Sequence, residues 1–367
     1  MLAESHPLVR RFLRFLALPY CFVRLINWSE CSKSKYQVAT DLWHIFFVLK
    51  YYPDNYSPCR LDEKSRDNWI YYYGSTYNSY TRYKLRKNVQ PFEYQLLFND
   101  KIVCEQLCRG MSVKLPQYYG VVDPATDYKF KLESIFRNSG QNKLIIKPYM
   151  GHAGRGIDMA IKHGNKILIR TDGEELDIAN YKLSEKAIIQ EVVIQDERIA
   201  KISASSVNTI RVVTFYTKSD DVIIVSASMR FGVGTSIVDN WSSGGIAVGI
   251  NHETGKLMRV AYDKHGNEYH AHPDSGVVFS TYQIQPWEQI LQVAETVQKA
   301  CPFYRMIGVD IAISKDGPVL IEVNANPDIV FQEQTAGPLL KNKKVLNAFA
   351  EDDLLINKYQ KMLLKST

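Results

Sequence analysis

The chain lacks the sequence features that most quickly indicate the class of a protein. Its six cysteines are scattered among 367 residues, with no CxxC pair and no Cys/His cluster, so a zinc site is not expected. A disulfide framework is unusual for a chain of this length. No apolar run approaches about 18 uncharged residues, which argues against a transmembrane helix, and arginines interrupt the first apolar run, which argues against a secretory leader. We therefore expect a cytoplasmic protein with reduced, mostly buried thiols.

The chain also has little excess of one sign of charge over the other. The chain has 45 Lys and Arg against 39 Asp and Glu, a net charge of +6, and residues 1–36 hold six of the cations but two of the anions. The remainder is nearly balanced, which does not indicate a nucleic-acid-binding surface. With 46% apolar residues, the composition is that of a soluble globular protein. The length is sufficient for two or three domains.

The familiar phosphate-binding motifs are missing too. The glycine segment GHAGRG at 151–156 is not a Walker loop, because no Gly-Lys-Ser/Thr closes it, and its glycine order is GxxGxG where a dinucleotide fold needs GxGxxG. The kinase motifs HRD and DFG are absent. What is present is a short apolar strand, Leu144–Lys147, then the glycines, then strand-like alternation. This order favours a hairpin lid over a triphosphate, with Lys147 supplying charge; a plain surface hairpin is the alternative.

The stretch Ile307–Pro327 predicts a hairpin of two strands, Gly308–Ser314 and Pro318–Ala325, around Lys315–Gly317. If Ser314 pairs with Pro318, Asp310 lies opposite Glu322. Alternation then assigns one apolar face, made of Val309, Ile311, Ile313, Val319, Ile321 and Val323. The other face carries Asp310, Glu322 and Asn324.

The polar face of this hairpin is a candidate metal site. Facing side chains have Cβ atoms about 4.5–5.5 Å apart, and two carboxylates that close repel unless they share a proton or a cation. Asp310, Glu322 and Asn324 offer hard oxygen ligands, which suit Mg²⁺ held jointly with nucleotide phosphates. The alternative is a hairpin whose polar face lies in water.

Two arginines stand inside apolar strands: Arg211 in Ser206–Tyr216 and Arg230 in Val222–Phe231. An unpaired guanidinium there is costly. Bidentate binding of a carboxylate or a phosphate explains the position, and a structural ion pair explains it equally well. Three histidines further on have no visible partner set and are expected at the surface; they are His265, His270 and His272.

Residues 8–18 (LVRRFLRFLAL) predict an amphipathic helix. At about 100° per residue, Arg10, Arg11 and Arg14 share one face and the apolar residues fill the remainder. One interpretation is a helix on a membrane surface, with its basic face toward anionic lipid; the other is a terminal helix packed on its own domain, with its arginines in water. The six tyrosines of residues 71–83 favour a packing segment over base stacking.

Helices are also expected over Val38–Tyr51, over Phe92–Cys108 with a cap at Asn99–Asp100, over Gln285–Ala300 and over Leu346–Leu364. Taken in order, the lysines, glycine lid, strand arginines and acidic hairpin resemble the ATP-grasp superfamily over residues 91–340. The strongest matches are LIIKPYMGHAGRGI and GVDIAISKDGPVLIEVNANPD. SVNTIRVVTF and the following Arg-to-Gly-Gly block resemble the sugar-transfer-associated branch.

The resemblance implies an α+β fold in which two lobes grip ATP, preceded by a helical, Tyr-rich region. The expected parts are an accessory region at 1–90, a first lobe with the glycine lid at 91–185, a second lobe with the metal site at 186–345, and a C-terminal helix at 346–367. Residues 1–90 depart from the family, because no βαβ pattern is visible there.

The resemblance also implies roles for individual residues. The nucleotide would be held by Lys101, Lys147, Gly151, His152, Gly154, Arg155, Gly156, Gln190, Glu191, Val192 and Val193. Lys114 is an alternative to Lys101, and the ribose contact is either Asp196 or Glu197. Asp310, Glu322 and Asn324 would hold one or two Mg²⁺ ions, while Arg211 and Arg230 would bind the acceptor carboxylate or the transferring phosphoryl group.

The function implied is an ATP-dependent carboxylate–amine ligase that works through an acyl phosphate, on sugar-linked or amino-acid substrates in surface polysaccharide biosynthesis. The alternatives are an ATP-grasp peptide ligase or phosphotransferase, and a non-catalytic nucleotide-binding or membrane-docking protein. We expect a cytoplasmic location, with residues 8–18 as the candidate contact to the inner face of a membrane.

Overall fold

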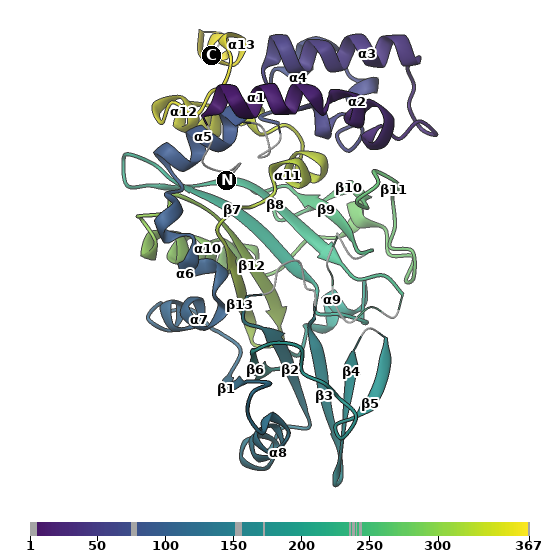
Figure 1. The fold of residues 1–367 in the computed structure, drawn as a ribbon, viewed down its shortest axis with the longest axis vertical. Helices are drawn as coiled ribbons and strands as arrows, with labels where there is room; N and C mark the ends of the chain where they lie inside the picture. The colour runs from purple at the N-terminus through teal and green to yellow at the C-terminus, as the bar shows by residue number, and fades with distance from the viewer. Residues whose placement is uncertain are drawn as a thin grey trace.

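Two antiparallel sheets carry the fold, and helices from both ends of the chain gather above the larger sheet (Figure 1). This computed structural model describes residues 6–74, 79–150, 156–171, 173–234, 236, 239, 241 and 244–365. The mixture of helices and antiparallel sheets agrees with the expected α+β class. Within the described residues, no helix has the length and apolar character needed to cross a membrane.

The smaller sheet has six strands in the order β1-β6-β2-β3-β4-β5. Their bounds are β1 Tyr118–Val122, β2 Lys143–Pro148, β3 Asp158–His163, β4 Lys166–Thr171, β5 Glu174–Asp177 and β6 Ala187–Glu191. The boundary expected at residue 185 falls just before β6, which pairs with β1 and β2. Strand β6 of this sheet therefore belongs to the start of the expected second lobe.

The larger sheet has seven strands in the order β11-β10-β9-β8-β7-β12-β13. Their bounds are β7 Thr209–Tyr216, β8 Val222–Phe231, β9 Ile246–Ile250, β10 Leu257–Tyr262, β11 Glu268–Tyr269, β12 Met306–Ser314 and β13 Gly317–Asn324. Its apolar face packs on α10, Trp287–Ala300, close to the helix expected there. His272 is buried in this half of the molecule, so the expectation of a surface position was wrong. Its Nε2 lies 3.0 Å from the Gly232 carbonyl, and its ring meets Phe231 edge-on.

The hairpin β12–β13 places Asp310 opposite Glu322, as predicted. The turn itself differs, because Ser314 pairs with Gly317 and not with Pro318. A bulge between Asp310 and Ile311 corrects the register, since Ile311 pairs with Leu320 and leaves one extra residue on β13. Leu320 therefore joins the apolar core in place of the expected Ile321.

Before β1, the chain forms η5 Phe92–Tyr94, α6 Leu96–Asn99 and α7 Lys101–Arg109. The expected single helix over 92–108 is therefore broken. Asp100 has extended backbone (φ −81°, ψ 109°) and accepts hydrogen bonds from the amides of Ile102 and Val103, so it is the N-cap of α7. The predicted cap is confirmed. It sets the start of α7 and makes Lys101 the first residue of this helix.

The remaining helices of the sheet regions are α8 Tyr128–Ser139, α9 Glu197–Ala200, η7 Phe279–Thr281 and α11 Ile329–Ala336. The N-terminal region holds α1 Pro7–Leu16, α2 Leu18–Tyr20, η1 Cys21–Leu25, α3 Lys35–His44, η2 Ile45–Leu49, η3 Pro53–Asn55, η4 Leu61–Glu63, α4 Arg66–Trp69 and α5 Ser79–Asn88. The C-terminal part adds η8 Leu339–Lys341, α12 Lys343–Glu351, α13 Lys358–Met362 and η9 Leu363–Lys365. One continuous helix over 346–364 was therefore wrong.

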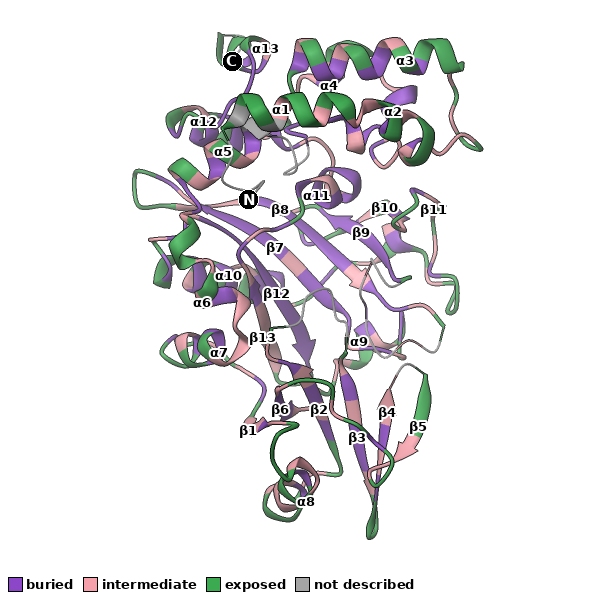
Figure 2. Ribbon diagram, in the orientation of Figure 1, coloured by how far each residue is buried: buried purple, intermediate pink, exposed green. Residues whose placement is uncertain are grey.

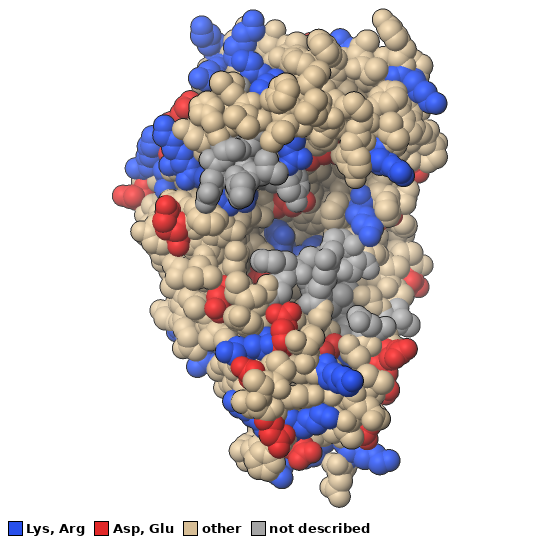
Figure 3. Space-filling model, in the orientation of Figure 1, with Lys and Arg blue, Asp and Glu red and all other residues tan. Residues whose placement is uncertain are grey.

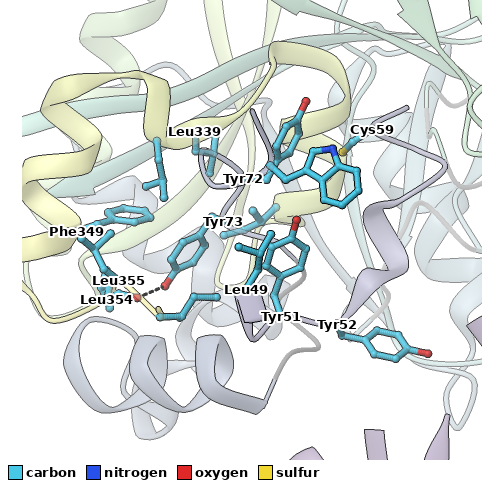
Figure 4. Close-up of a cluster of buried hydrophobic side chains, with 14 of the residues drawn as sticks. Leu49, Tyr51, Tyr52, Cys59, Tyr72, Tyr73, Leu339, Phe349, Leu354 and Leu355 are labelled. Carbon is cyan, nitrogen blue, oxygen red and sulfur yellow. Dashed lines mark hydrogen bonds between the residues drawn. The ribbon is translucent and has the colours of Figure 1, made fainter. Parts of the chain in front are cut away.

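One apolar core joins the two ends of the chain. Leu49, Tyr51, Tyr72 and Tyr73 pack with Leu339, Phe349, Leu354 and Leu355 (Figure 4). The hydroxyl of Tyr73 donates to the Leu354 carbonyl at 3.1 Å. The described tyrosines at 71–73 thus serve packing, as expected, and the helical region forms one body with the C-terminal helices.

A buried carboxylate ties this helical layer to α11. Glu333 accepts hydrogen bonds from the backbone amides of Tyr73 (2.6 Å), Gly74 (3.1 Å) and Leu339 (3.4 Å). Gly74 has φ +81°, and a Cβ there would lie 2.7 Å from the Tyr51 ring, so only glycine fits. Burial raises the pKa of Glu333 to about 8 from its ordinary value of 4.5, although the three amides act in the opposite direction.

Arg11 and Arg14 of helix α1 lie against the rest of the molecule. Arg11 donates to the Phe46 carbonyl and lies 4.4 Å from the centre of the Phe46 ring, and Arg14 lies 5.3 Å from the centre of the Tyr52 ring. For Arg11 and Arg14 the expectation of solvated side chains was therefore wrong. The outward side is exposed along the helix (Figure 2) and carries large apolar residues.

We predict that Glu333 makes stability depend on pH. A raised pKa in the folded state means that the fold holds the proton more tightly, so this contribution is complete below about pH 4.5 and is lost as the pH rises through about 8. The free energy of unfolding should fall between about pH 6 and 8 by at most about 1.4 kcal/mol per pH unit. Urea unfolding of Glu333→Gln should lack this component, whereas the exposed Glu93→Gln should keep it. Equal slopes in the wild type and Glu333→Gln would contradict the assignment.

Candidate active site

A pocket lies between the two sheets, where β2 and β6 of the smaller sheet face β13 of the larger one. Helix α7 closes one side. The residues that line it are Phe98, Lys101, Cys104, Glu105, Cys108, Leu115, Lys147, Ile188, Gln190, Leu320, Ile321, Glu322 and Val323. Most of the wall is apolar, and its charged groups come from three separate elements, an arrangement typical of a small-molecule site.

The structure brings both predicted lysines into this pocket. Lys101 begins α7, and its Nζ lies 3.3 Å from Oε1 of Glu322 on β13. Lys147 stands near the end of β2. Burial lowers the pKa of Lys147, and the like charge of Lys101 lowers it further, while Glu322 opposes both. Lys114 lies elsewhere, with its Nζ 3.4 Å from Asp316 in the hairpin turn.

Of the predicted nucleotide residues 190–193, one contributes a side chain to the pocket. Gln190 on β6 donates from Nε2 to Oε2 of Glu105 at 3.0 Å, and Glu105 also accepts from Arg109 at 3.2 Å. Glu191 turns the other way, since its Oε2 accepts from the amide of Gln117 at 3.0 Å. The residues that follow, Val192 and Val193, are half-buried and do not line the pocket.

The carboxylate of Asp310 lies between the two strand arginines. Arg211 binds it with two hydrogen bonds, Nε to Oδ1 and Nη2 to Oδ2, each 2.7 Å long. Nη2 of Arg230 donates to Oδ2 at 2.8 Å, and Nδ2 of Asn324 lies 3.3 Å from the same oxygen. Burial alone would raise the pKa of Asp310, but the two guanidinium groups outweigh it and lower that pKa.

A second buried carboxylate holds Arg230 from the other side. Asp239 Oδ2 lies 3.6 Å from Nε of Arg230 and accepts from the amide of Thr209 at 2.7 Å. The Thr209 hydroxyl lies between them, because it donates to Asp239 and accepts from Arg230. Burial raises the pKa of Asp239, whereas the two carboxylates raise the pKa of Arg230. Arg230 therefore stays charged and is fixed in direction by Asp239, Thr209 and Asp310.

The acidic hairpin offers oxygen ligands only, which fits magnesium. Glu322 is about one-third exposed, with 34% of its side chain accessible, while Asp310 is buried at 3%. No cluster of three or more His, Cys, Asp or Glu side chains arranged for a metal occurs in the part of the chain that the structure describes. A protein-only cage is therefore not formed, but Mg²⁺ is commonly held by one or two carboxylates together with substrate phosphates. Of the predicted metal ligands, Glu322 is the accessible carboxylate, whereas both oxygens of Asp310 accept hydrogen bonds from the arginines.

Part of the expected nucleotide set cannot be placed. Gly151, His152, Gly154 and Arg155 lie outside the described residues. Gly156 is described; it has φ +68°, and a Cβ there would lie 3.0 Å from Pro148, so the turn after β2 requires glycine. Of the two ribose candidates, Asp196 is the N-cap of α9 and pairs with Arg198, while Glu197 is exposed.

Sequence reasoning missed Glu105, Thr209 and Asp239. Glu105 lies one helical turn from Lys101 on α7, so the spacing i, i+4 from a candidate lysine was a usable signal. The sequence around Asp239 has no helix or strand periodicity that would single it out. In Figure 3 this face of the molecule is hollowed below the helical layer, with Lys and Arg side chains at the back of the hollow.

Comparisons with known proteins agree with this architecture. A family model described as sugar-transfer associated ATP-grasp matches residues 80–349, more than half of the chain. No curated protein matches the sequence. Among solved structures, N5-carboxyaminoimidazole ribonucleotide synthetase from Thermotoga maritima is 13% identical with a TM-score of 0.36, over 69% of this chain and 52% of that one.

D-Alanine-D-alanine ligase from Helicobacter pylori is 11% identical with a TM-score of 0.40, over 72% of this chain and 61% of that one. The chain thus spans only about half to three-fifths of these two solved chains. At TM-scores this low, neither likeness carries an argument about activity.

We predict that Asp310→Asn destabilises the fold by about 3 kcal/mol, because it leaves two largely buried guanidinium groups without their carboxylate. Urea unfolding at neutral pH measures the loss. Asp353→Asn is the matched control, since Asp353 pairs with Lys84 at 2.9 Å but is 70% exposed, and its loss should stay below about 1 kcal/mol. Equal losses in the two variants would show that the Asp310 pair contributes no more than a surface pair.

Proposed function

Because the chain belongs to the sugar-transfer-associated ATP-grasp family, we propose that it is an ATP-dependent ligase that joins a carboxylate to an amine. The observation that carries the proposal is the pocket between the sheets, which collects Lys101, Lys147 and Glu322 beside the arginines that hold Asp310. Phosphoryl transfer needs cations that bind the triphosphate and, beside them, cations that bind the acceptor.

In this proposal the adenine occupies the apolar part of the pocket, between Phe98 on α6 and Ile188 on β6, with the Gln190 amide at its polar edge. Lys101 and Lys147 contact the phosphates. The low pKa that burial gives Lys147 rises again when phosphate oxygens approach, so ATP binding and protonation of this lysine reinforce each other. Gly151, His152, Gly154, Arg155 and Gly156 would cover the phosphates, and Glu197 is the exposed carboxylate available to the ribose.

Asp310, Glu322 and Asn324 are the residues that would hold magnesium. The ion, when bound with ATP, neutralises phosphate charge and favours departure of ADP. The contribution of the chain is to fix these oxygens on one hairpin, opposite the lysines of the pocket. The ion pair of Lys101 with Glu322 keeps these two charges in place.

The two arginines are suited to orient the acceptor. Among the described residues, Nη1 of Arg211 and Nη1 of Arg230 make no hydrogen bond, while the other guanidinium donors are engaged with Asp310 and Thr209. Each arginine therefore keeps a donor group for a carboxylate or for the γ-phosphoryl oxygens. Asp310 fixes the direction of both.

The reaction has two steps. An oxygen of the substrate carboxylate bonds to the γ-phosphorus of ATP, and the bond from that phosphorus to the bridging oxygen of ADP breaks, giving an acyl phosphate. The amine nitrogen then bonds to the acyl carbon, phosphate leaves, and the nitrogen loses a proton to give the amide. Positioning and charge neutralisation perform this work, and water must be excluded from the acyl phosphate.

We further propose a sugar-linked or amino-acid substrate, surface polysaccharide biosynthesis as the setting, and the cytoplasm as the location. The family description supports the link to sugar transfer. The six cysteines are free, five of them buried, which agrees with a reducing compartment. The other ATP-grasp reactions, peptide ligation and phosphotransfer, use the same nucleotide site, so product analysis separates them.

We predict that Glu322→Gln lowers ADP formation by about a hundredfold or more while the fold is kept. The substitution removes a negative charge from the metal side of the pocket and leaves side-chain volume nearly unchanged. Coupled-enzyme detection of ADP measures the rate. Asp316→Asn in the turn of the same hairpin is the control and should keep full activity. Unchanged turnover in Glu322→Gln would remove the metal assignment.

We predict that Lys147→Met weakens ATP binding by about ten- to a hundredfold, because a charge-assisted hydrogen bond to phosphate is lost. Calorimetric titration with ATP measures the affinity. Lys143→Met lies on the same strand but is exposed, and it should bind ATP like the wild type. A matching loss in both variants would point to general damage of β2.

A screen of carboxylates and amines, with ADP release and mass spectrometry of products, tests the reaction class. An amide product that requires both substrates supports the ligase. ADP release with a phosphorylated alcohol and no amide would replace it with a phosphotransferase. ATP binding without ADP release under any pair would favour the non-catalytic alternative.

A further inference from the structure

We propose that the outward side of α1 and the adjoining end of α3 form a docking face for an anionic membrane surface. The face is defined by Leu8, Phe12, Phe15 and Leu16 of α1, Trp43 of α3 and Phe47 of η2. Leu8, Phe12, Leu16 and Trp43 have 60%, 63%, 59% and 58% of their surface exposed. Single exposed apolar residues are ordinary, but a contiguous set of this size marks an interaction site.

Ring contacts show that the docking face is continuous. The centre of the Phe15 ring lies 5.7 Å from that of Phe47, and the centre of the Phe47 ring lies 4.0 Å from that of Trp43. Residues 8, 12, 15 and 16 follow helical spacing, so they project from one side of α1. The two helices thus present a single surface, at the outer end of the molecule in Figure 1.

The outward direction of the apolar side is built into the fold. Arg11 is held by the Phe46 carbonyl and the Phe46 ring, and Arg14 lies against the Tyr52 ring. These contacts hold Arg11 and Arg14 against the molecule, and Leu8, Phe12 and Leu16 are left in water. An amphipathic helix on the surface of a globular protein normally turns its apolar side to the core. Helix α1 is held with its apolar side toward the solvent.

Charge and composition select a lipid surface as the occupant. Among the described side chains of residues 1–36, Arg11 and Arg14 lie against aromatic rings and Lys33 pairs with the buried Asp41. The cations Arg24 and Lys35 are exposed. A second copy of the chain would bring these cations against each other, whereas anionic headgroups would attract them. Tyr20 and Tyr36, 58% and 80% exposed, add the amphipathic aromatic side chains that favour a membrane–water interface.

The docking face is separate from the proposed ligase. None of its residues lines the nucleotide pocket or contacts Asp310. Loss of membrane binding and loss of catalysis can therefore be told apart in the same preparation. A variant of the docking face should keep the fold and any ADP formation of the wild type.

The experiment uses the full chain and sedimentation with vesicles of phosphatidylcholine, with or without phosphatidylglycerol. We expect the wild type to pellet with the anionic vesicles and to be released by salt. The double variant Phe12→Ser, Leu16→Ser should bind about tenfold or more weakly, since two large apolar side chains are lost. The control Phe130→Ser removes an equally exposed apolar residue, 60% accessible, from α8, and should pellet like the wild type.

A charge-reversal pair separates the two parts of the proposal. Arg24→Glu with Lys35→Glu should weaken binding to the anionic vesicles about tenfold or more, and Lys166→Glu, exposed on β4, should not. Equal pelleting of the wild type and the Phe12→Ser, Leu16→Ser variant would overturn the proposal. So would equal binding to both kinds of vesicle, or a lipid-free dimer that this variant dissociates, because the face would then bind a second copy.

Discussion

The carboxylate of Asp310 is the constraint on which this half of the molecule depends. It lies on β12 between β7, which supplies Arg211, and β13, which supplies Glu322, and it also reaches Arg230 on β8. A buried charge is tolerated only when its partners are in position. Four neighbouring strands must therefore keep their register for the ion pairs to form, and the same register places the acidic face of the hairpin toward the pocket.

The pocket depends in turn on contacts between the two sheets. Lys101 begins α7, whose Cys104 and Cys108 pack in the core of the larger sheet, and its ammonium group meets Glu322 of that sheet. Glu105 of the same helix holds Gln190 on β6. A single helix, α7, thus links the wall of the pocket to its acidic floor. A change in the position of α7 would alter both the proposed nucleotide lysines and the proposed ligands of the metal.

Much of this site was predictable, because it depends on alternation and order along the chain. The pairing of Asp310 with Glu322 follows from the period of a strand, and the cap at Asp100 follows from local chemistry. The turn was misjudged by one residue, since a bulge near Ile321 leaves no mark in the pattern. Long-range burial was harder to predict, because the sequence near His272 or Asp239 does not indicate which residues pack on them. Arg11 and Arg14 likewise face the molecule because of Phe46 and Tyr52, many residues away.

The hydrogen bonds of Glu333 determine whether the chain can be shortened without loss of the fold. Only eight residues separate Asn324, at the end of the hairpin, from Glu333, whose carboxylate is bound by the amides of Tyr73, Gly74 and Leu339. Val213, Phe215 and Met306 of the larger sheet belong to the same core as the tyrosines of the helical layer. The N-terminal helices are therefore not a separable part of the chain. A fragment that begins near residue 91 would expose an apolar face of the larger sheet and leave Glu333 buried without the amides of Tyr73 and Gly74, so the smallest unit that keeps this fold includes the N-terminal region.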